Sequence, residues 1–126
     1  MTKKRVLVVD DEQKFTRLLK LNLEETGEYD VRVENRAPWA VEVMREFEPD
    51  LILLDMVMPH MSGYEVATEM KEAMGARKVP ILFLSAAVKW EEGGQSTDTV
   101  HDYPVIPKPI TMTELLTHIE RSTCAV

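Results

Sequence analysis

The sequence predicts an α/β fold, a doubly wound, five-stranded parallel sheet with helices on both faces. Short aliphatic runs of strand length alternate with longer segments whose apolar residues recur at helical spacing. The aliphatic runs have no polar residue at alternate positions, which is typical of parallel strands covered on both faces. With 126 residues and 44% hydrophobic composition, the chain can bury a single core. We therefore expect one domain that spans residues 1–126.

The first half of the chain predicts two strand–helix pairs. Val6–Val9 is the first aliphatic run, and the apolar stripe after it predicts a helix that ends at Gly27. Alternating apolar residues at 29–33 predict the second strand. A second stripe at 40–47 predicts a helix with Pro38 in its first turn.

The middle of the chain continues this alternation. Leu51–Leu54 and Ile81–Leu84 are two further all-apolar runs and predict the third and fourth strands. Ser62 is placed to cap the helix between them, because a serine hydroxyl can accept a hydrogen bond from the first helical turn.

The last part of the chain is less regular. Residues 86–103 contain two consecutive glycines and a polar run, so we expect the fourth helix to be short or irregular. Trp90 in this segment is either an anchor for a partner or packed against the sheet. Prolines on both sides of residues 105–106 place the fifth strand at a sheet edge. The capping box Thr111-x-x-Glu114 then begins a final helix.

Polar side chains follow four of the five predicted strands. Asp10 and Asp11 follow the first, Asp55 the third, Ser85 the fourth and Lys108 the fifth, whereas the second strand contributes nothing comparable. Each of these residues alone would be an ordinary cap, turn residue or solvated charge. Because ligands in such folds bind at the carboxyl ends of the strands, the complete set indicates a functional site.

The chemistry of this set favours phosphoryl transfer. Three carboxylates at one edge repel each other, and a hard divalent cation such as Mg²⁺ would relieve that repulsion. Lys108 can neutralise a carboxylate or bind a phosphoryl group, and Ser85 can donate a hydrogen bond to a phosphoryl oxygen. Aspartate is a known covalent acceptor of phosphoryl groups, and Asp55 stands alone on its strand opposite the acidic pair.

Four motifs in order resemble the receiver domain of bacterial two-component response regulators, the single-domain chemotaxis regulator among them. They are V-L-V-V-D-D-E at 6–12, L-I-L-L-D-M-V-M-P-H-M-S-G-Y-E at 51–65, L-S-A at 84–86 and P-K-P-I at 107–110. The resemblance covers essentially the whole chain. It implies a flavodoxin-like fold with strand order 2-1-3-4-5.

The resemblance also implies how the carboxylates act. Asp55 would accept a phosphoryl group from a sensor histidine kinase or a phosphotransfer protein. Asp11, Asp55 and the backbone carbonyl of Val57 would bind Mg²⁺ directly, and Asp10 would act through water. Phosphorylation would then change a surface that binds a downstream protein or a fused effector domain.

The resemblance gives Ser85 and Lys108 the role of binding the phosphoryl oxygens, with a cis bond between Lys108 and Pro109. The chain departs from the family pattern at Val105, where receivers usually carry an aromatic residue; Tyr103 lies two residues earlier. Together with the irregular segment before it, this departure leaves open a receiver-like interaction module whose phospho-dependent output is lost or atypical.

Two enzymatic functions are disfavoured. An aspartyl-phosphate phosphohydrolase resembling the haloacid dehalogenases needs a second aspartate two residues after the nucleophile, and that position is Val57. We therefore expect no enzyme, at most slow self-dephosphorylation. A flavin or dinucleotide function lacks a glycine-rich phosphate loop after the first strand.

Composition restricts the partners and the compartment. A net charge of −7 and a pI near 5.0 argue against nucleic-acid binding by this domain. The apolar run near the N-terminus is too short for a signal peptide or a membrane span. Cys124 is the only cysteine, so no intrachain disulfide can form. We therefore expect a cytoplasmic protein.

Overall fold

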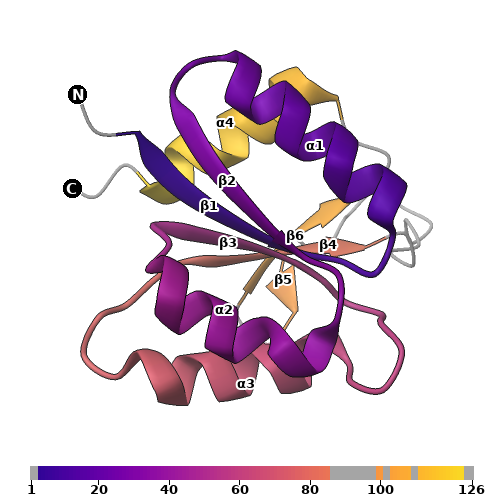
Figure 1. Cartoon of the computed structure of the whole chain (residues 1–126), viewed down its shortest axis with the longest axis vertical. Helices are drawn as coiled ribbons and strands as arrows, with labels where there is room; N and C mark the ends of the chain where they lie inside the picture. The colour runs from indigo at the N-terminus through magenta and orange to yellow at the C-terminus, as the bar shows by residue number, and fades with distance from the viewer. Residues whose placement is uncertain (1–2, 86–98, 101–102, 109–110, 124–126) are drawn as a thin grey trace.

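The fold is a twisted sheet between two helical layers, seen in a computed structural model that describes residues 3–85, 99–100, 103–108 and 111–123. The sheet order is β2-β1-β3-β4-β6-β5 (Figure 1). The elements are β1 (Lys4–Val9), α1 (Gln13–Glu25), β2 (Tyr29–Glu34), a 3-10 turn η1 (Ala37–Trp39), α2 (Ala40–Phe47), β3 (Leu51–Asp55), α3 (Gly63–Met74), β4 (Ile81–Ser85), β5 (Thr99–Val100), β6 (Tyr103–Pro107) and α4 (Met112–Thr123).

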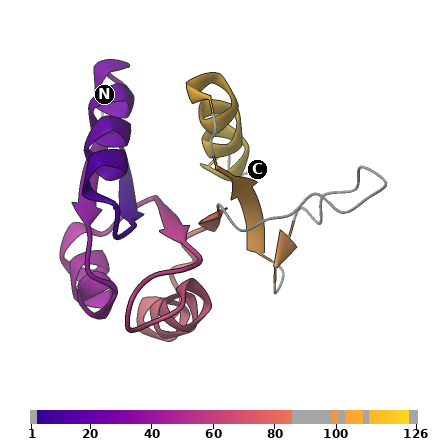
Figure 2. The same ribbon diagram turned by 90° about the vertical axis from the view of Figure 1, so that its right-hand side faces the viewer.

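The predicted doubly wound fold is confirmed. β2, β1, β3, β4 and β6 are all parallel, which is the order 2-1-3-4-5 when β6 is counted as the fifth parallel strand. Helices α1 and α4 cover one face of the sheet and α2 and α3 the other (Figures 1 and 2). This right-handed alternation brings the carboxyl ends of the strands to one edge.

The prediction that the fifth strand lies at the edge of the sheet is wrong. The two residues of β5 pair antiparallel with β6, Thr99 with Pro104 and Val100 with Tyr103. Proline at position 104 lacks an N–H, but a pairing of two residues requires few hydrogen bonds, so the proline does not prevent it. The expected fourth helix, Trp90, Pro109 and Cys124 lie outside the described residues.

The strands are apolar throughout because each faces two cores. Leu7 and Val9 pack on the side of α2 and α3, whereas Val6 and Val8 pack on the side of α1 and α4. The strand β3 alternates in the same way, and all five of its residues are buried. This two-sided burial explains the continuous aliphatic runs in the sequence.

Local signals mark the start of α3 and α4 and the end of α1, as the sequence predicts. The Ser62 hydroxyl accepts a hydrogen bond from the N–H of Glu65 at 3.2 Å, which caps α3. Gly27, just after α1, has a φ of +79° that favours glycine. The Thr111 hydroxyl accepts from the N–H of Glu114 at 3.2 Å, which supplies half of the predicted capping box.

Candidate acidic phosphoacceptor site

The five predicted site residues lie at one edge of the sheet. Asp55 is the last residue of β3 and Ser85 the last residue of β4, and these strands are neighbours. Asp10 and Asp11 follow β1 on the other side of β3. Lys108 follows β6, and its N–H donates to the Ser85 carbonyl at 2.9 Å. The sheet order therefore brings the ends of three other strands, β1, β4 and β6, around Asp55.

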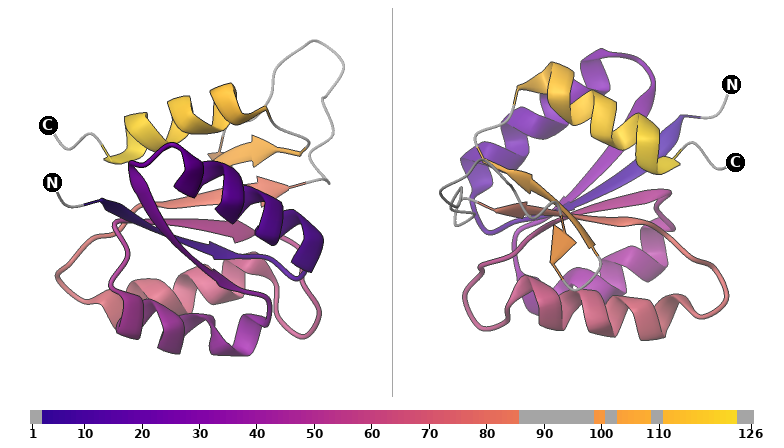
Figure 3. Two further views of the ribbon diagram at one scale, coloured as in Figure 1. Left: turned by 45° about the horizontal axis from the view of Figure 1, so that its top comes forward. Right: turned by 180° about the vertical axis from the view of Figure 1, so that it is seen from behind.

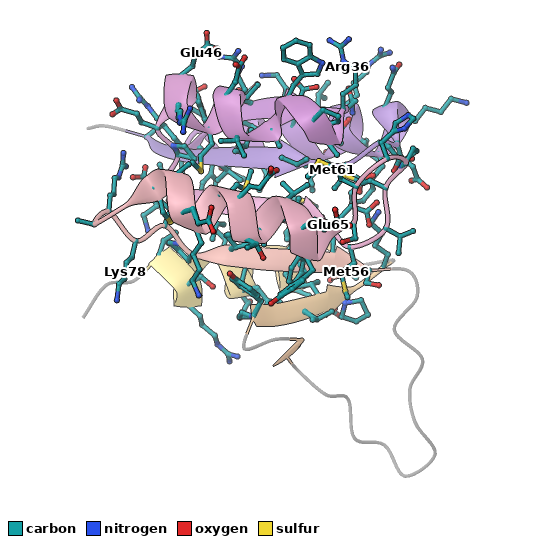
Figure 4. The ribbon with its side chains drawn as sticks, turned by 90° about the horizontal axis from the view of Figure 1, so that it is seen from below. Arg36, Glu46, Met56, Met61, Glu65 and Lys78 are labelled. Atoms are coloured by element: carbon teal, nitrogen blue, oxygen red, sulfur yellow. The ribbon has the colours of Figure 1, made fainter. Side chains whose placement is uncertain are left out.

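Figure 4 shows this edge from below the sheet. Met56, Met61 and Glu65, from the loop after β3 and the start of α3, lie at the same end of the molecule as Arg36. Glu46 and Lys78 lie at the opposite end. β1 begins and α4 ends at that opposite end as well (Figure 3), where the Lys4 ammonium donates to the Thr123 hydroxyl at 3.0 Å.

Three carboxylates form a cluster that could hold a metal ion. Asp10, Asp11 and Asp55 each offer one oxygen, and these three oxygens lie within 4.8 Å of one another. Asp10 is fully buried and Asp55 is buried, whereas Asp11 is exposed. The cluster is therefore fixed on its inner side and open to solvent at Asp11, and its all-oxygen donor set suits a hard cation.

Lys108 supplies the counter-charge. Its Nζ lies 2.6 Å from Oδ2 of Asp10 and 3.7 Å from Oδ1 of Asp55, and the Phe15 ring centroid lies 4.5 Å away. Desolvation favours the neutral amine, but the hydrogen bond and the charge of Asp10 outweigh it, so the pKa of Lys108 is raised. Lys108 therefore stays charged within reach of both carboxylates.

Asp55 has a perturbed acidity. Burial, followed by the negative charge of Asp10, raises the pKa of Asp55 to about 6. The Lys108 ammonium and a hydrogen bond from the Val57 N–H act in the opposite direction without cancelling the rise. At neutral pH the carboxylate is ionised but costly to keep charged, which makes it responsive to any cation that enters the site.

The loop after Asp55 depends on a glycine. The Gly63 N–H donates to the Met56 carbonyl at 2.8 Å, which draws the start of α3 against the end of β3. A Cβ at residue 63 would lie 2.3 Å from the main-chain oxygen of Asp55, so no larger residue fits without movement. The side chain of Met58 is buried in this loop, while the side chain of Val57 is exposed.

The statement that the second strand contributes nothing comparable is wrong. Asn35, one residue after β2, donates from Nδ2 to the Asp10 carbonyl at 2.8 Å and to the Thr16 hydroxyl at 2.9 Å. Thr16 on α1 is buried and donates to the Gln13 carbonyl at 3.0 Å. A polar residue directly after β2 was visible in the sequence, but its partner is a main-chain atom that no motif reveals.

This chain belongs to the response regulator receiver domain family, whose model matches residues 6–120. It is 39% identical over 83 residues to the alkaline phosphatase synthesis transcriptional regulatory protein PhoP of Bacillus subtilis, covering 66% of this chain and 33% of that protein. It is 30% identical over 118 residues to the DNA-binding dual master transcriptional regulator RpaA of Synechocystis sp., covering 91% of this chain and 47% of that protein.

The fold is also similar to that of a solved structure of a chemotaxis protein. The structure of the chemotaxis protein CheY4 of Vibrio cholerae superimposes with a TM-score of 0.77 at 26% identity, covering 96% of this chain and 99% of that one. The chain thus spans about a third to a half of the length of the two curated relatives, and its fold is that of a flavodoxin-like receiver domain. Receiver domains are in general regulatory phosphoacceptor domains of two-component systems and not enzymes.

Among the described residues, no helix is long and apolar enough to cross a membrane.

Proposed function

We propose that this domain, residues 1–126, is a phosphorylation-dependent signalling switch. Asp55 accepts a phosphoryl group from a sensor histidine kinase or a phosphotransfer protein in a Mg²⁺-dependent reaction, and the change alters a partner-binding surface. The observation that carries the proposal is the charge arrangement around Asp55, in which two further carboxylates and the Lys108 ammonium meet its side chain.

The residues present fit a magnesium ion. The three clustered carboxylate oxygens are hard donors, and Mg²⁺ is usually bound by one or two carboxylates together with waters and phosphate oxygens. We assign direct binding to Asp11, Asp55 and the backbone carbonyl of Val57, and a water-mediated contact to Asp10. When bound, the ion neutralises negative charge on the phosphoryl oxygens and the carboxylates.

The transfer step uses the Asp55 carboxylate as nucleophile. A carboxylate oxygen forms a bond to phosphorus while the phosphorus–nitrogen bond of phosphohistidine breaks, and the electron pair remains on the imidazole nitrogen, which takes up a proton. Lys108 and the hydroxyl of Ser85 donate hydrogen bonds to the phosphoryl oxygens. Lys108 already lies 3.7 Å from Asp55, so a small shift of its ammonium brings it to a group on that carboxylate.

The proposed activity is a single transfer rather than turnover. Hydrolysis of an acyl phosphate by an enzyme uses an acid or base beside the nucleophile, and the side chain two residues on is an exposed valine, Val57. We therefore propose that the phosphorylated state is lost only through slow self-dephosphorylation. Such persistence suits a switch, because the modified state must last long enough to be recognised.

The proposed partners follow from the charge of the chain and from its relatives. The curated relatives are transcriptional regulators, one of them DNA-binding, and this chain matches less than half of each. A net charge of −7 argues against nucleic-acid binding by this domain, so we assign the output to a downstream protein or a fused effector domain in the cytoplasm.

A second function, a receiver-like interaction module with lost or atypical phospho-dependent output, is favoured by the surroundings of β6. Val105 is buried at the position where receivers usually carry an aromatic residue. The nearby Tyr103 ring instead packs edge-on against Phe83, with centroids 5.2 Å apart, and the Lys71 ammonium lies 5.1 Å from the Tyr103 ring. These two contacts leave the Tyr103 ring less freedom to report a change at Asp55.

The test is an NMR titration with beryllium fluoride, a mimic of the phosphoryl group, in the presence of Mg²⁺. The proposal expects Asp55-dependent binding, with amide shifts in the pocket and on a surface away from it; Asp55→Asn should abolish the response, and Asp30→Asn, a change to an exposed carboxylate on β2, should preserve it. Absence of binding by the unaltered protein rejects the phosphorylation-dependent switch and leaves only an interaction module whose phospho-dependent output is lost. Shifts confined to the pocket favour the interaction module.

A further inference from the structure

We infer that Asn35 is a positioning residue that sets the affinity of the acidic site for divalent cations. The inference rests on the proposed function, because it concerns the same site. Asn35 does not belong to the carboxylate cluster, and nothing in its own chemistry would bind Mg²⁺ strongly. Its effect is exerted through the main chain that carries Asp10 and Asp11.

The side chain of Asn35 supplies a hydrogen bond at the point where the backbone ladder between β1 and β2 stops. The last ladder contact on this side of β1 is the N–H of Asp10, which donates to the Glu34 carbonyl at 3.2 Å. The next donor along β2, the N–H of Arg36, instead binds the side chain of Glu34 at 2.9 Å. The Asp10 carbonyl therefore receives its hydrogen bond from the Asn35 side chain at 2.8 Å.

The orientation of the Asn35 amide is fixed by its partners. A main-chain carbonyl can only accept a hydrogen bond, so the NH2 end of the amide must face Asp10. The second N–H reaches the hydroxyl of Thr16, which is 1% exposed and in turn donates to the Gln13 carbonyl. Asn35 thus ties the ends of β1 and β2 to the first turn of α1.

The hydrogen bond from Asn35 to the Asp10 carbonyl also affects the position of Asp11, because the peptide unit is planar. The carbonyl of Asp10 and the N–H of Asp11 belong to the same rigid plane, so holding the carbonyl also fixes the direction in which residue 11 leaves the strand. The Asp11 carboxylate is exposed and accepts no hydrogen bond from the described part of the chain. Its position within the carboxylate cluster is therefore set by the backbone that Asn35 holds.

Asp10 is held independently of Asn35 at its side chain. Its Oδ1 accepts from the Glu12 N–H at 3.0 Å and its Oδ2 from Lys108 at 2.6 Å. Loss of the Asn35 amide should therefore leave Asp10 and Lys108 in place and loosen mainly Asp11, the side of the cluster that opens to solvent. The expected defect is weaker cation binding with an intact fold.

The experiment measures Mg²⁺ affinity by isothermal titration calorimetry, and thermal unfolding with Mg²⁺ and with EDTA. Asn35→Leu keeps a similar volume without donors, Thr16→Val removes the second anchor, and Asn22→Leu is the same change on α1 away from the site. We expect Asn35→Leu to weaken binding by about tenfold, the lower end for loss of a residue that orients metal ligands. Thr16→Val should weaken it less, and Asn22→Leu should not change it.

The melting temperatures separate positioning from a structural role. A positioning residue reduces the rise in Tm produced by Mg²⁺, because that rise follows the affinity. A merely structural residue lowers Tm equally with Mg²⁺ and with EDTA, and an unchanged Mg²⁺ affinity in Asn35→Leu overturns the inference. If Asn35→Leu does not fold, an unchanged affinity in Thr16→Val overturns it instead. No binding by the unaltered protein rejects the Mg²⁺ part of the proposed function, and this inference with it.

Discussion

Replacing the Asp55 carboxylate by an amide should stabilise the metal-free protein at neutral pH. Burial and the charge of Asp10 raise the pKa of Asp55 from 3.8 to about 6, so the folded state disfavours its ionised form. Asp55→Asn keeps the shape of the side chain and removes the charge. The residue proposed to carry the function is thus expected to cost stability when no cation is present.

The size and pH dependence of the effect follow from proton linkage. Between about pH 4 and pH 6 the folded state binds more protons at Asp55 than the unfolded state, so the free energy of unfolding falls as pH rises through this range. At about 1.4 kcal/mol per pKa unit the ceiling is roughly 3 kcal/mol. Because the site opens to solvent, we expect about 1–2 kcal/mol at pH 7.5 and almost no difference below pH 4.

The assay is urea unfolding in EDTA from pH 3.5 to pH 8, comparing Asp55→Asn with the unaltered protein. Subtracting the two curves removes the contribution of the other carboxylates, and Asp30→Asn, at an exposed position on β2, should stay within about 0.5 kcal/mol throughout. A destabilised Asp55→Asn at pH 7.5 would refute the reasoning. So would a stabilisation that is the same at pH 4 and at pH 7.5.

Three further substitutions test other parts of the site. Lys108→Met leaves the fully buried Asp10 without its counter-charge, so we expect a loss of about 3 kcal/mol at pH 7 by urea unfolding. Gly63→Ala places a Cβ against the Asp55 carbonyl and should cost about 2–3 kcal/mol, with shifted amide resonances around residue 55. Ser62→Ala removes the cap of α3 and should cost about 1 kcal/mol without altering cation binding.

The fold could be predicted from the sequence because its strands are buried on both faces. A parallel strand between two helical layers is apolar at every position because both of its faces are buried. This explains the continuous apolar runs at Val6–Val9, Leu51–Leu54 and Ile81–Leu84. The pairing of β5 with β6 could not be predicted in this way. The two residues Thr99 and Val100 are too few to show a period, and the prolines around β6 indicated an edge instead.

The candidate site, too, could be predicted from the sequence only in part. Its charged and hydroxyl residues could be predicted because parallel topology brings the ends of successive strands together, whatever the details of packing. Asn35 could not be placed, because its partners are a carbonyl and a threonine hydroxyl with no motif of their own. Nor could the raised pKa of Asp55, which depends on burial and on distances to Asp10 and Lys108.

The surroundings of Asp55 and the surroundings of β6 differ in how readily they could change in the proposed switch. Around Asp55 the structure concentrates negative charge that is costly without a cation, so binding of Mg²⁺ and a phosphoryl group can shift an equilibrium by relieving it. Around β6, Val105 is buried, and the ring of Tyr103 contacts both Phe83 and the Lys71 ammonium, which restrict its rotation. A signal that starts at Asp55 is therefore more easily carried by the backbone at the strand ends, where Lys108 bonds to Ser85, than by rotation of an aromatic ring.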